Sequence, residues 1–184
     1  MKKERVSIFI DGSNLYHILK NIFNDKKPIN FNFGKFVEYL VGDKDLIGVF
    51  YYNSPLDRNK DEEGYRKQQR FFDMIQRIPK FHLILCRMQK RKVDGKIIYE
   101  VKEDDIHLAV DMVKLAYNEM YDTAILVSTD GDFVPAIEAV KEKGKRVENV
   151  GFETKFSWHL KQKSDRFYRL SKEDLNAFFK YHEE

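Results

Sequence analysis

The chain has 184 residues, of which 42% are hydrophobic and 34% charged, and its formal net charge at pH 7 is +3. These values are typical of a soluble globular protein, and the length suits one domain over residues 1–184. No apolar run approaches the roughly 20 residues of a transmembrane helix, which excludes a membrane-spanning protein. The mild positive charge permits nucleic-acid binding without requiring it.

The first predicted element is a buried strand over Val6–Ile10, because an apolar, β-branched run ends there at a turn signal. Charged residues lead straight into it, so we expect no signal peptide. Asp11 ends the strand, Gly12 permits a tight turn, and Ser13 is predicted to cap the following helix. Asp11 should therefore lie at the edge of a sheet where α/β folds bind ligands.

The next elements follow from hydrophobic periodicity. Helices are predicted over Asn14–Ile22, Phe31–Val41 and Tyr65–Ile78, and strands over Leu46–Tyr52 and Phe81–Cys86. Cys86 is the one cysteine and cannot form an intrachain disulfide, so we expect a cytoplasmic protein.

The segment Arg87–Val101 differs from its surroundings. Asp94-Gly95 at its centre is a strong hairpin signal, and the segment carries several lysines and arginines. We predict a basic β-hairpin or ordered loop, which either contacts nucleic acid or is a solvated turn.

The C-terminal half repeats the alternation of helices and strands. Helices are predicted over Asp104–Met120, Phe133–Lys143, Ser157–Lys163 and Lys172–Tyr181, and strands over Asp122–Ser128, Arg146–Gly151 and Arg166–Leu170. This alternation predicts an α/β fold, with a mostly parallel sheet covered by helices on both faces.

Three aspartates are predicted at one edge of that sheet. Asp130 and Asp132 follow the fourth strand as Asp11 follows the first. Parallel βαβ connections bring all strand carboxyl ends to the same edge. If the first and fourth strands are neighbours, these acids lie close together.

The helix from Asp104 offers a fourth carboxylate. On a helical projection Asp105 falls within the apolar arc, whereas Asp104 and Asp111 fall within the polar one. The arc comprises Ile106, Ala109, Val110, Met112, Val113, Ala116 and Tyr117. Asp105 either caps the helix dipole or joins the other acids, because a carboxylate on a buried face needs a partner.

Clustered carboxylates favour one or two hard divalent cations, and such a site hydrolyses phosphodiesters. No histidine and cysteine set has zinc-ligand spacing, and we expect the five histidines to be structural or on the surface. Ser13 has no evident His-Asp partners, so helix capping remains its expected role.

Three stretches together resemble the motifs of NYN domains, in the PIN-like nuclease superfamily. They are Ile10–Asn14, Lys102–Met112 and Val127–Phe133, and the region from Gly144 to Leu160 is similar to the LabA-like bacterial branch. The resemblance runs from about Arg5 to Phe178. It implies a three-layer α/β/α sandwich, PIN-like and Rossmann-like, with a central mostly parallel sheet.

The activity implied by this resemblance is that of a Mg²⁺- or Mn²⁺-dependent endoribonuclease acting on single-stranded or structured RNA. Asp11, Asp105, Asp130 and Asp132 would bind the metal. Asn14 would complete the catalytic set by orienting the substrate or a water molecule, and Asp104 is a candidate fifth acid. Glu103 and Thr129 stand where glycine is common in the family.

Substrate contacts are expected outside the acidic cluster. Lys20, Lys90, Arg91 and Lys92 are candidates for contacts with the RNA backbone. Tyr16 either stacks on an unpaired base or packs within the protein.

Two other functions fit the sequence less well. A regulatory module that binds RNA or protein without turnover would keep the acidic pocket and use exposed aromatic residues. Whether the chain forms a homodimer is left open by the sequence. A phosphatase on a related fold would need Asp-x-Asp after the first strand, where this chain has Asp11-Gly12-Ser13.

Overall fold

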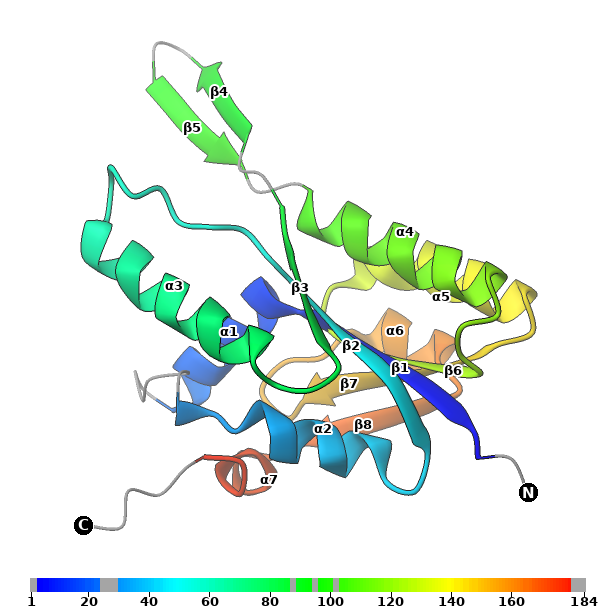
Figure 1. Ribbon diagram of the computed structural model, residues 1–184. Helices are drawn as coiled ribbons and strands as arrows, with labels where there is room; N and C mark the ends of the chain where they lie inside the picture. Colours follow the sequence, from blue (N-terminus) through cyan, green and yellow to red (C-terminus); the bar gives the residue numbers. More distant parts are fainter. Residues whose placement is uncertain (1–2, 24–29, 87–88, 94–95, 101–102, 180–184) are drawn as a thin grey trace.

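The computed structural model describes residues 3–23, 30–86, 89–93, 96–100 and 103–179 (Figure 1). The central sheet contains β1 (Arg5–Asp11), β2 (Asp45–Asn53), β3 (Phe81–Leu85), β6 (Thr123–Val127), β7 (Arg146–Phe152) and β8 (Arg166–Leu170). The helices are α1 (Gly12–Ile22), α2 (Phe33–Val41), α3 (Glu62–Gln76), α4 (Asp104–Tyr117), α5 (Val134–Glu142), α6 (Trp158–Lys163) and α7 (Lys172–Asn176). A separate antiparallel hairpin consists of β4 (Gln89–Val93) and β5 (Lys96–Glu100).

The sheet has the order β3-β2-β1-β6-β7-β8, and every pairing in it is parallel. The chain adds strands on one side of β1 and then on the far side of β6. The strand order therefore reverses between β1 and β6, and a crevice at the carboxyl ends of such strands is the usual ligand site of an open α/β sheet. The first and fourth predicted strands, β1 and β6, are neighbours, which is the condition under which the acids were expected to lie close together.

Helices cover both faces of the sheet, which confirms the three-layer prediction (Figure 1). On one face α1, α2, α3 and α7 pack against side chains such as Ile8 and Ile10 of β1. On the other face α4, α5 and α6 pack against Phe9 and Leu126. Both sides of β1 are thus buried, which fits its nearly continuous apolar sequence.

Some predicted element boundaries are wrong. Helix α3 begins at Glu62 rather than Tyr65, because the Asp61 side chain accepts the N–H of Gly64 and caps it. Helix α7 ends at Asn176, short of the predicted end at Tyr181, which lies outside the described residues. The hairpin is confirmed in its backbone, whereas the Asp94-Gly95 turn lies outside the described part of the chain.

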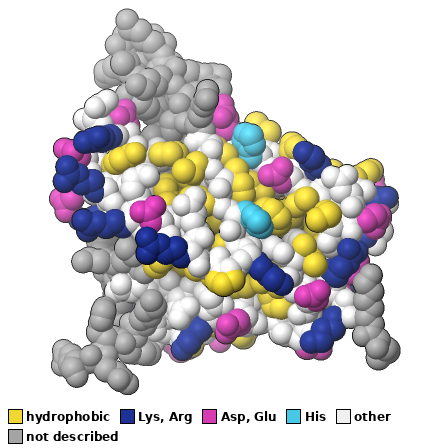
Figure 2. Space-filling model, in the orientation of Figure 1, with side chains coloured by type: hydrophobic (Ala, Val, Ile, Leu, Met, Phe, Trp, Pro, Cys, Tyr) yellow, Lys and Arg dark blue, Asp and Glu magenta, His cyan; other side chains and the backbone are white. Residues whose placement is uncertain are grey.

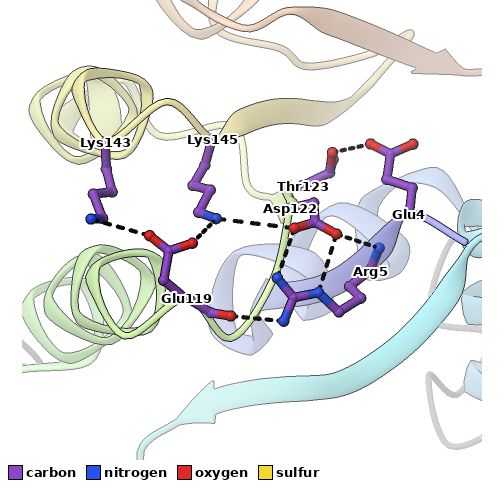
Figure 3. Close-up of polar contacts among 7 residues, drawn as sticks. All are labelled: Glu4, Arg5, Glu119, Asp122, Thr123, Lys143 and Lys145. Atoms are coloured by element: carbon purple, nitrogen blue, oxygen red, sulfur yellow. Dashed lines mark hydrogen bonds and ion pairs between the residues drawn. The ribbon is translucent and has the colours of Figure 1, made fainter. Parts of the chain in front are cut away.

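A cluster of ion pairs joins the starts of β1 and β6 (Figure 3). The Arg5 guanidinium contacts Asp122, with 2.7 Å between Nη2 and Oδ1, and donates to the carbonyl of Glu119. The Glu119 carboxylate in turn pairs with Lys143 and Lys145. These contacts bind together, at their amino ends, the two strands whose carboxyl ends carry the acids.

Across the described ranges, no helix combines the length and the apolar character needed to cross a bilayer.

Candidate functional site

Four aspartates line one pocket of about 340 Å³ at the carboxyl edge of the sheet. Asp11 ends β1, Asp130 follows β6, and Asp104 and Asp105 open α4. The lining residues are Asp11, Ser13, Asn14, His17, Asp104, Asp105, Asp130 and Lys155. The strand reversal therefore brings together carboxylates from three separate parts of the chain.

Asp11 is almost completely buried, with 6% of its surface exposed. One oxygen accepts the N–H of Asn14 at 3.0 Å, and the other accepts the Ser128 hydroxyl at 3.1 Å. Burial raises the pKa of Asp11 to about 7, and the charges of Asp105 and Asp104 add to this rise.

Asp11, and not Ser13, caps helix α1. The predicted role of Ser13 is wrong because the helix already begins at Gly12, directly after the strand, and the Asp11 carboxylate reaches the N–H of the third helical residue. Ser13 lies instead in the wall of the pocket.

Asn14 is held in the pocket wall by Thr129. The Thr129 N–H donates to Asn14 Oδ1 at 3.2 Å, and Asn14 Nδ2 donates to Thr129 Oγ1 at 3.1 Å. This paired contact fixes the amide group and links α1 to the end of β6. Thr129 stands where the resemblance predicts glycine, and its contacts position the Asn14 amide.

Asp104 has an oxygen without a hydrogen-bond partner among the described residues. Its Oδ1 accepts the Ser54 hydroxyl at 2.6 Å, and the Cys86 thiol lies near the carboxylate, whereas the buried Oδ2 makes no hydrogen bond of normal geometry with any described residue. Only 5% of Asp104 is exposed. An unsatisfied buried carboxylate oxygen is costly, and a cation in the pocket would offset that cost.

The predicted phase of α4 is wrong. The helix buries Asp104, Leu108, Met112 and Ala116, whereas Ile106, Val110 and Tyr117 are more than half exposed. Asp105 is therefore exposed beside the core instead of lying within it. The pKa of Asp105 is nevertheless raised, by partial burial first and then by the charges of Asp130, Asp104 and Asp132, so it lies among the acids.

Asp130 and Asp132 differ in position. The Asp130 carboxylate accepts the N–H of Asp132 at 2.9 Å, which caps the 3₁₀ turn η2 (Gly131–Phe133). Asp130 lines the pocket, and Asp132 is exposed outside the lining set. Of this pair, only Asp130 thus lines the pocket.

The predicted substrate residues are only partly near the acids. Tyr16 is 43% exposed and has its ring against that of His17, which lines the pocket. Lys20 is exposed further along α1. The side chains of Lys90, Arg91 and Lys92 lie outside the described part of the chain.

Sequence reasoning missed His17 and Lys155 as pocket residues. Lys155 belongs to a tight turn after β7, in which the N–H groups of Phe152 and Lys155 each donate to the other's carbonyl. Since β7 is parallel to β6, that turn must lie at the edge with the acids. This rule predicts the edge position of Lys155, and the packing of the turn decides that it lines the pocket.

The pocket acids fit a hard divalent cation by their chemistry. The donors are carboxylate oxygens, and one of them makes no hydrogen bond with the described residues. Burial first, and then repulsion between the acids, raises the pKa values of Asp11 and Asp105. Among the described residues, no group of three acidic, histidine or cysteine side chains is gathered closely enough to hold a metal ion as it stands.

The charge of Asp11 should make the apoprotein less stable at high pH. Its pKa is about 7 in the folded state and 3.8 as the ordinary value, so its stabilising contribution is complete below pH 4 and is lost as the pH rises to 7. In EDTA, the free energy of unfolding of Asp11→Asn relative to the wild type should rise by about 2.5 kcal/mol between pH 5 and pH 8. Urea unfolding at both pH values measures this difference, and an equal difference at the two would contradict it.

Comparison with known proteins supplies the family. A model of the NYN domain matches residues 5–171. The chain is 39% identical over 69 residues to uncharacterized protein MJ0482 of Methanocaldococcus jannaschii, a match covering 38% of this chain and only 29% of that relative. It is 25% identical to low amplitude and bright protein LabA of Synechococcus elongatus, over 96% of this chain and 88% of that protein.

A solved structure shares the fold. The crystal structure of VPA0982, a protein of unknown function from Vibrio parahaemolyticus, superposes with a TM-score of 0.70. The match covers 91% of this chain and 93% of the other, with 24% sequence identity.

Proposed function

The chain belongs to the NYN domain family, within the PIN-like nuclease superfamily, and from this premise we propose that it is a divalent-metal-dependent ribonuclease that cleaves RNA internally. The observation that carries the proposal is the convergence of Asp11, Asp104, Asp105 and Asp130 on one pocket. We also propose that residues 1–184 form one domain. In support of one domain, strands from both halves of the chain, from β1 to β8, pair within one six-stranded sheet.

Asp11, Asp105 and Asp130 would hold Mg²⁺ or Mn²⁺, with Asp104 as a further ligand through its unsatisfied oxygen. A bound ion of this kind makes water a stronger nucleophile at neutral pH and offsets the charge that develops during phosphodiester hydrolysis. Asp132, outside the pocket lining, would act through its charge on Asp105.

The neutral and basic pocket residues would position the substrate. Asn14, held by Thr129, would orient the phosphate or the attacking water through the remaining hydrogen of its amide. The Ser13 hydroxyl would donate to a phosphate oxygen, and the Lys155 ammonium would bind the negative charge of the RNA backbone.

Incubation with three substrates tests the proposed reaction. End-labelled single-stranded RNA, DNA of the same sequence and a phosphomonoester are each treated with the protein in Mn²⁺, Mg²⁺ or EDTA. We expect internal cuts in the RNA with a divalent ion and none in EDTA. Hydrolysis of the phosphomonoester alone, or cleavage of RNA in EDTA, would contradict the proposal.

A non-catalytic protein-binding module is the second candidate, because apolar side chains gather on the surface over α4 and the edge strand β3 (Figure 2). Ile106 and Val110 of α4 are 63% and 56% exposed, and Leu85 of β3 is 44% exposed. This module would bind the metal and show no turnover of any of the three substrates.

A further inference from the structure

A row of aromatic rings and cations begins beside the acidic pocket. Its members are Phe156, Trp158, Lys161, Phe167 and Arg169, on α6, on the turn before it and on β8. None of them belongs to the acidic pocket, and we call this set the α6–β8 row.

The row is built from successive contacts. The Lys161 ammonium lies 5.0 Å from the centre of the Trp158 ring and 5.6 Å from that of Phe167. The Phe156 and Phe167 rings are 5.6 Å apart, and the Arg169 guanidinium lies 5.4 Å from the Phe156 ring. A Cβ on Gly151 would lie 2.7 Å from the Cβ of Phe156 and 2.8 Å from the ring of Phe167, so both residues pack closely on β7 at this position.

The first turn of α6 adjoins the turn that carries Asp130 and Asp132. Gly131, between Asp130 and Asp132, lies so close to α6 that an added Cβ would be 3.3 Å from Ser157 Oγ and 4.0 Å from His159 Nδ1. Trp158 stands between these two residues in the sequence. The Ser157 hydroxyl fixes this first turn by accepting the N–H of Leu160 at 3.3 Å.

Trp158 is also unusually open for its size. Its side chain is 56% exposed, and Lys161 and Arg169 are exposed as well. Covering an exposed indole with a partner removes apolar surface from water and is favourable, and a cation beside an aromatic ring suits a ligand that is both anionic and aromatic. An unpaired nucleic-acid strand has both properties.

We propose that the α6–β8 row is the binding track for an unpaired RNA strand next to the pocket, with one base stacked on Trp158. Lys155, Lys161 and Arg169 bind the phosphates on either side of that base. The inference rests on the proposed ribonuclease function for its choice of RNA, and it names single-stranded RNA as the preferred substrate.

Trp158 reports on the proposal directly, because it is the one tryptophan of the chain. Titration of a twelve-nucleotide single-stranded RNA into the protein in EDTA should quench the tryptophan fluorescence to saturation. Duplex RNA should not quench it, because its bases are stacked on one another. Polyglutamate should not quench it either, because it is anionic but has no bases. An equal quench by polyglutamate would overturn base stacking at Trp158.

Two variants test the track by affinity, followed by anisotropy of a labelled RNA. Trp158→Leu should weaken binding about tenfold. Lys161→Gln should reduce the slope of log affinity against log salt by about 0.7. The matched control is Tyr117→Leu, because Tyr117 is 53% exposed with Lys143 at 5.5 Å from its ring but lies at the far end of α4. Unchanged affinity in Trp158→Leu would overturn the proposal.

Cleavage and fluorescence together distinguish a failure of the proposed RNA track from a failure of the proposed ribonuclease function. RNA cleavage without a fluorescence change in the wild type would overturn the track and leave the ribonuclease standing. A specific quench without cleavage in Mn²⁺ would support the track and overturn the ribonuclease. Neither cleavage nor quench would overturn both.

Discussion

Asp11→Asn and Asp130→Asn should each lower Mn²⁺-dependent RNA cleavage by at least about a hundredfold, since a catalytic metal contributes several kcal/mol to transition-state stabilisation. Both side chains line the pocket, from the ends of the two strands at which the sheet order reverses. Asparagine keeps a carbonyl that can accept the N–H of Asn14, so the cap of α1 should survive in Asp11→Asn. Initial rates of cleavage of a labelled RNA measure the effect.

The matched control for these variants is Asp111→Asn. Asp111 lies on α4 outside the pocket and accepts the Tyr52 hydroxyl at 3.0 Å, a bond that asparagine can also accept. The change in charge is the same, so the cleavage rate should stay within about twofold of the wild type on long-range electrostatics alone. Equal losses in Asp111→Asn and Asp11→Asn would remove the case for a specific acidic site.

Gly12→Ala should destabilise the protein by about 3 kcal/mol, because overpacking a buried position forces its neighbours to move. A Cβ on Gly12 would overlap the ring of Tyr51 and lie 2.5 Å from the carbonyl oxygen of Tyr52. Tyr51 is 1% exposed and cannot swing aside, and the Tyr52 carbonyl belongs to β2. Urea unfolding gives the change in free energy.

Gly34→Ala is the matched control for this substitution. Gly12 and Gly34 both lie in the first turn of a helix, but a Cβ on Gly34 would meet only the Asn32 side chain, at 3.4 Å. Alanine there should stabilise the protein by about 0.5 kcal/mol, because it reduces the entropy of the unfolded chain. Similar destabilisation by the two substitutions would contradict the packing argument for Gly12.

The edge position of the acids was predictable because it depends on topology. A buried strand that ends in Asp11 and another followed by Asp130 must deliver both to the same edge of a parallel sheet. The adjacency of β1 and β6, which decides how close the acids are, was a condition in the sequence argument, and the structure meets it.

The face of α4 was not predictable from the arc of apolar residues. Apolar side chains occur almost all round this helix, so its sequence does not single out one apolar face and the direction of burial depends on tertiary contacts. Ser54, on the segment after β2, donates to Asp104 and sets the helix phase at its start, while Tyr121 donates to the carbonyl of Met112 nearer its end. No local pattern around Asp104 shows either partner.

Thermal unfolding with increasing Mn²⁺ is the most direct test of the claim that Asp11 and Asp130 hold a metal ion in the pocket. Binding to the folded state alone raises the unfolding temperature in proportion to RT ln(1 + [Mn²⁺]/Kd). The wild type should show a saturable rise, which Asp111→Asn retains and Asp11→Asn and Asp130→Asn lose. An equal rise in all four proteins, or none in the wild type, would contradict the claim.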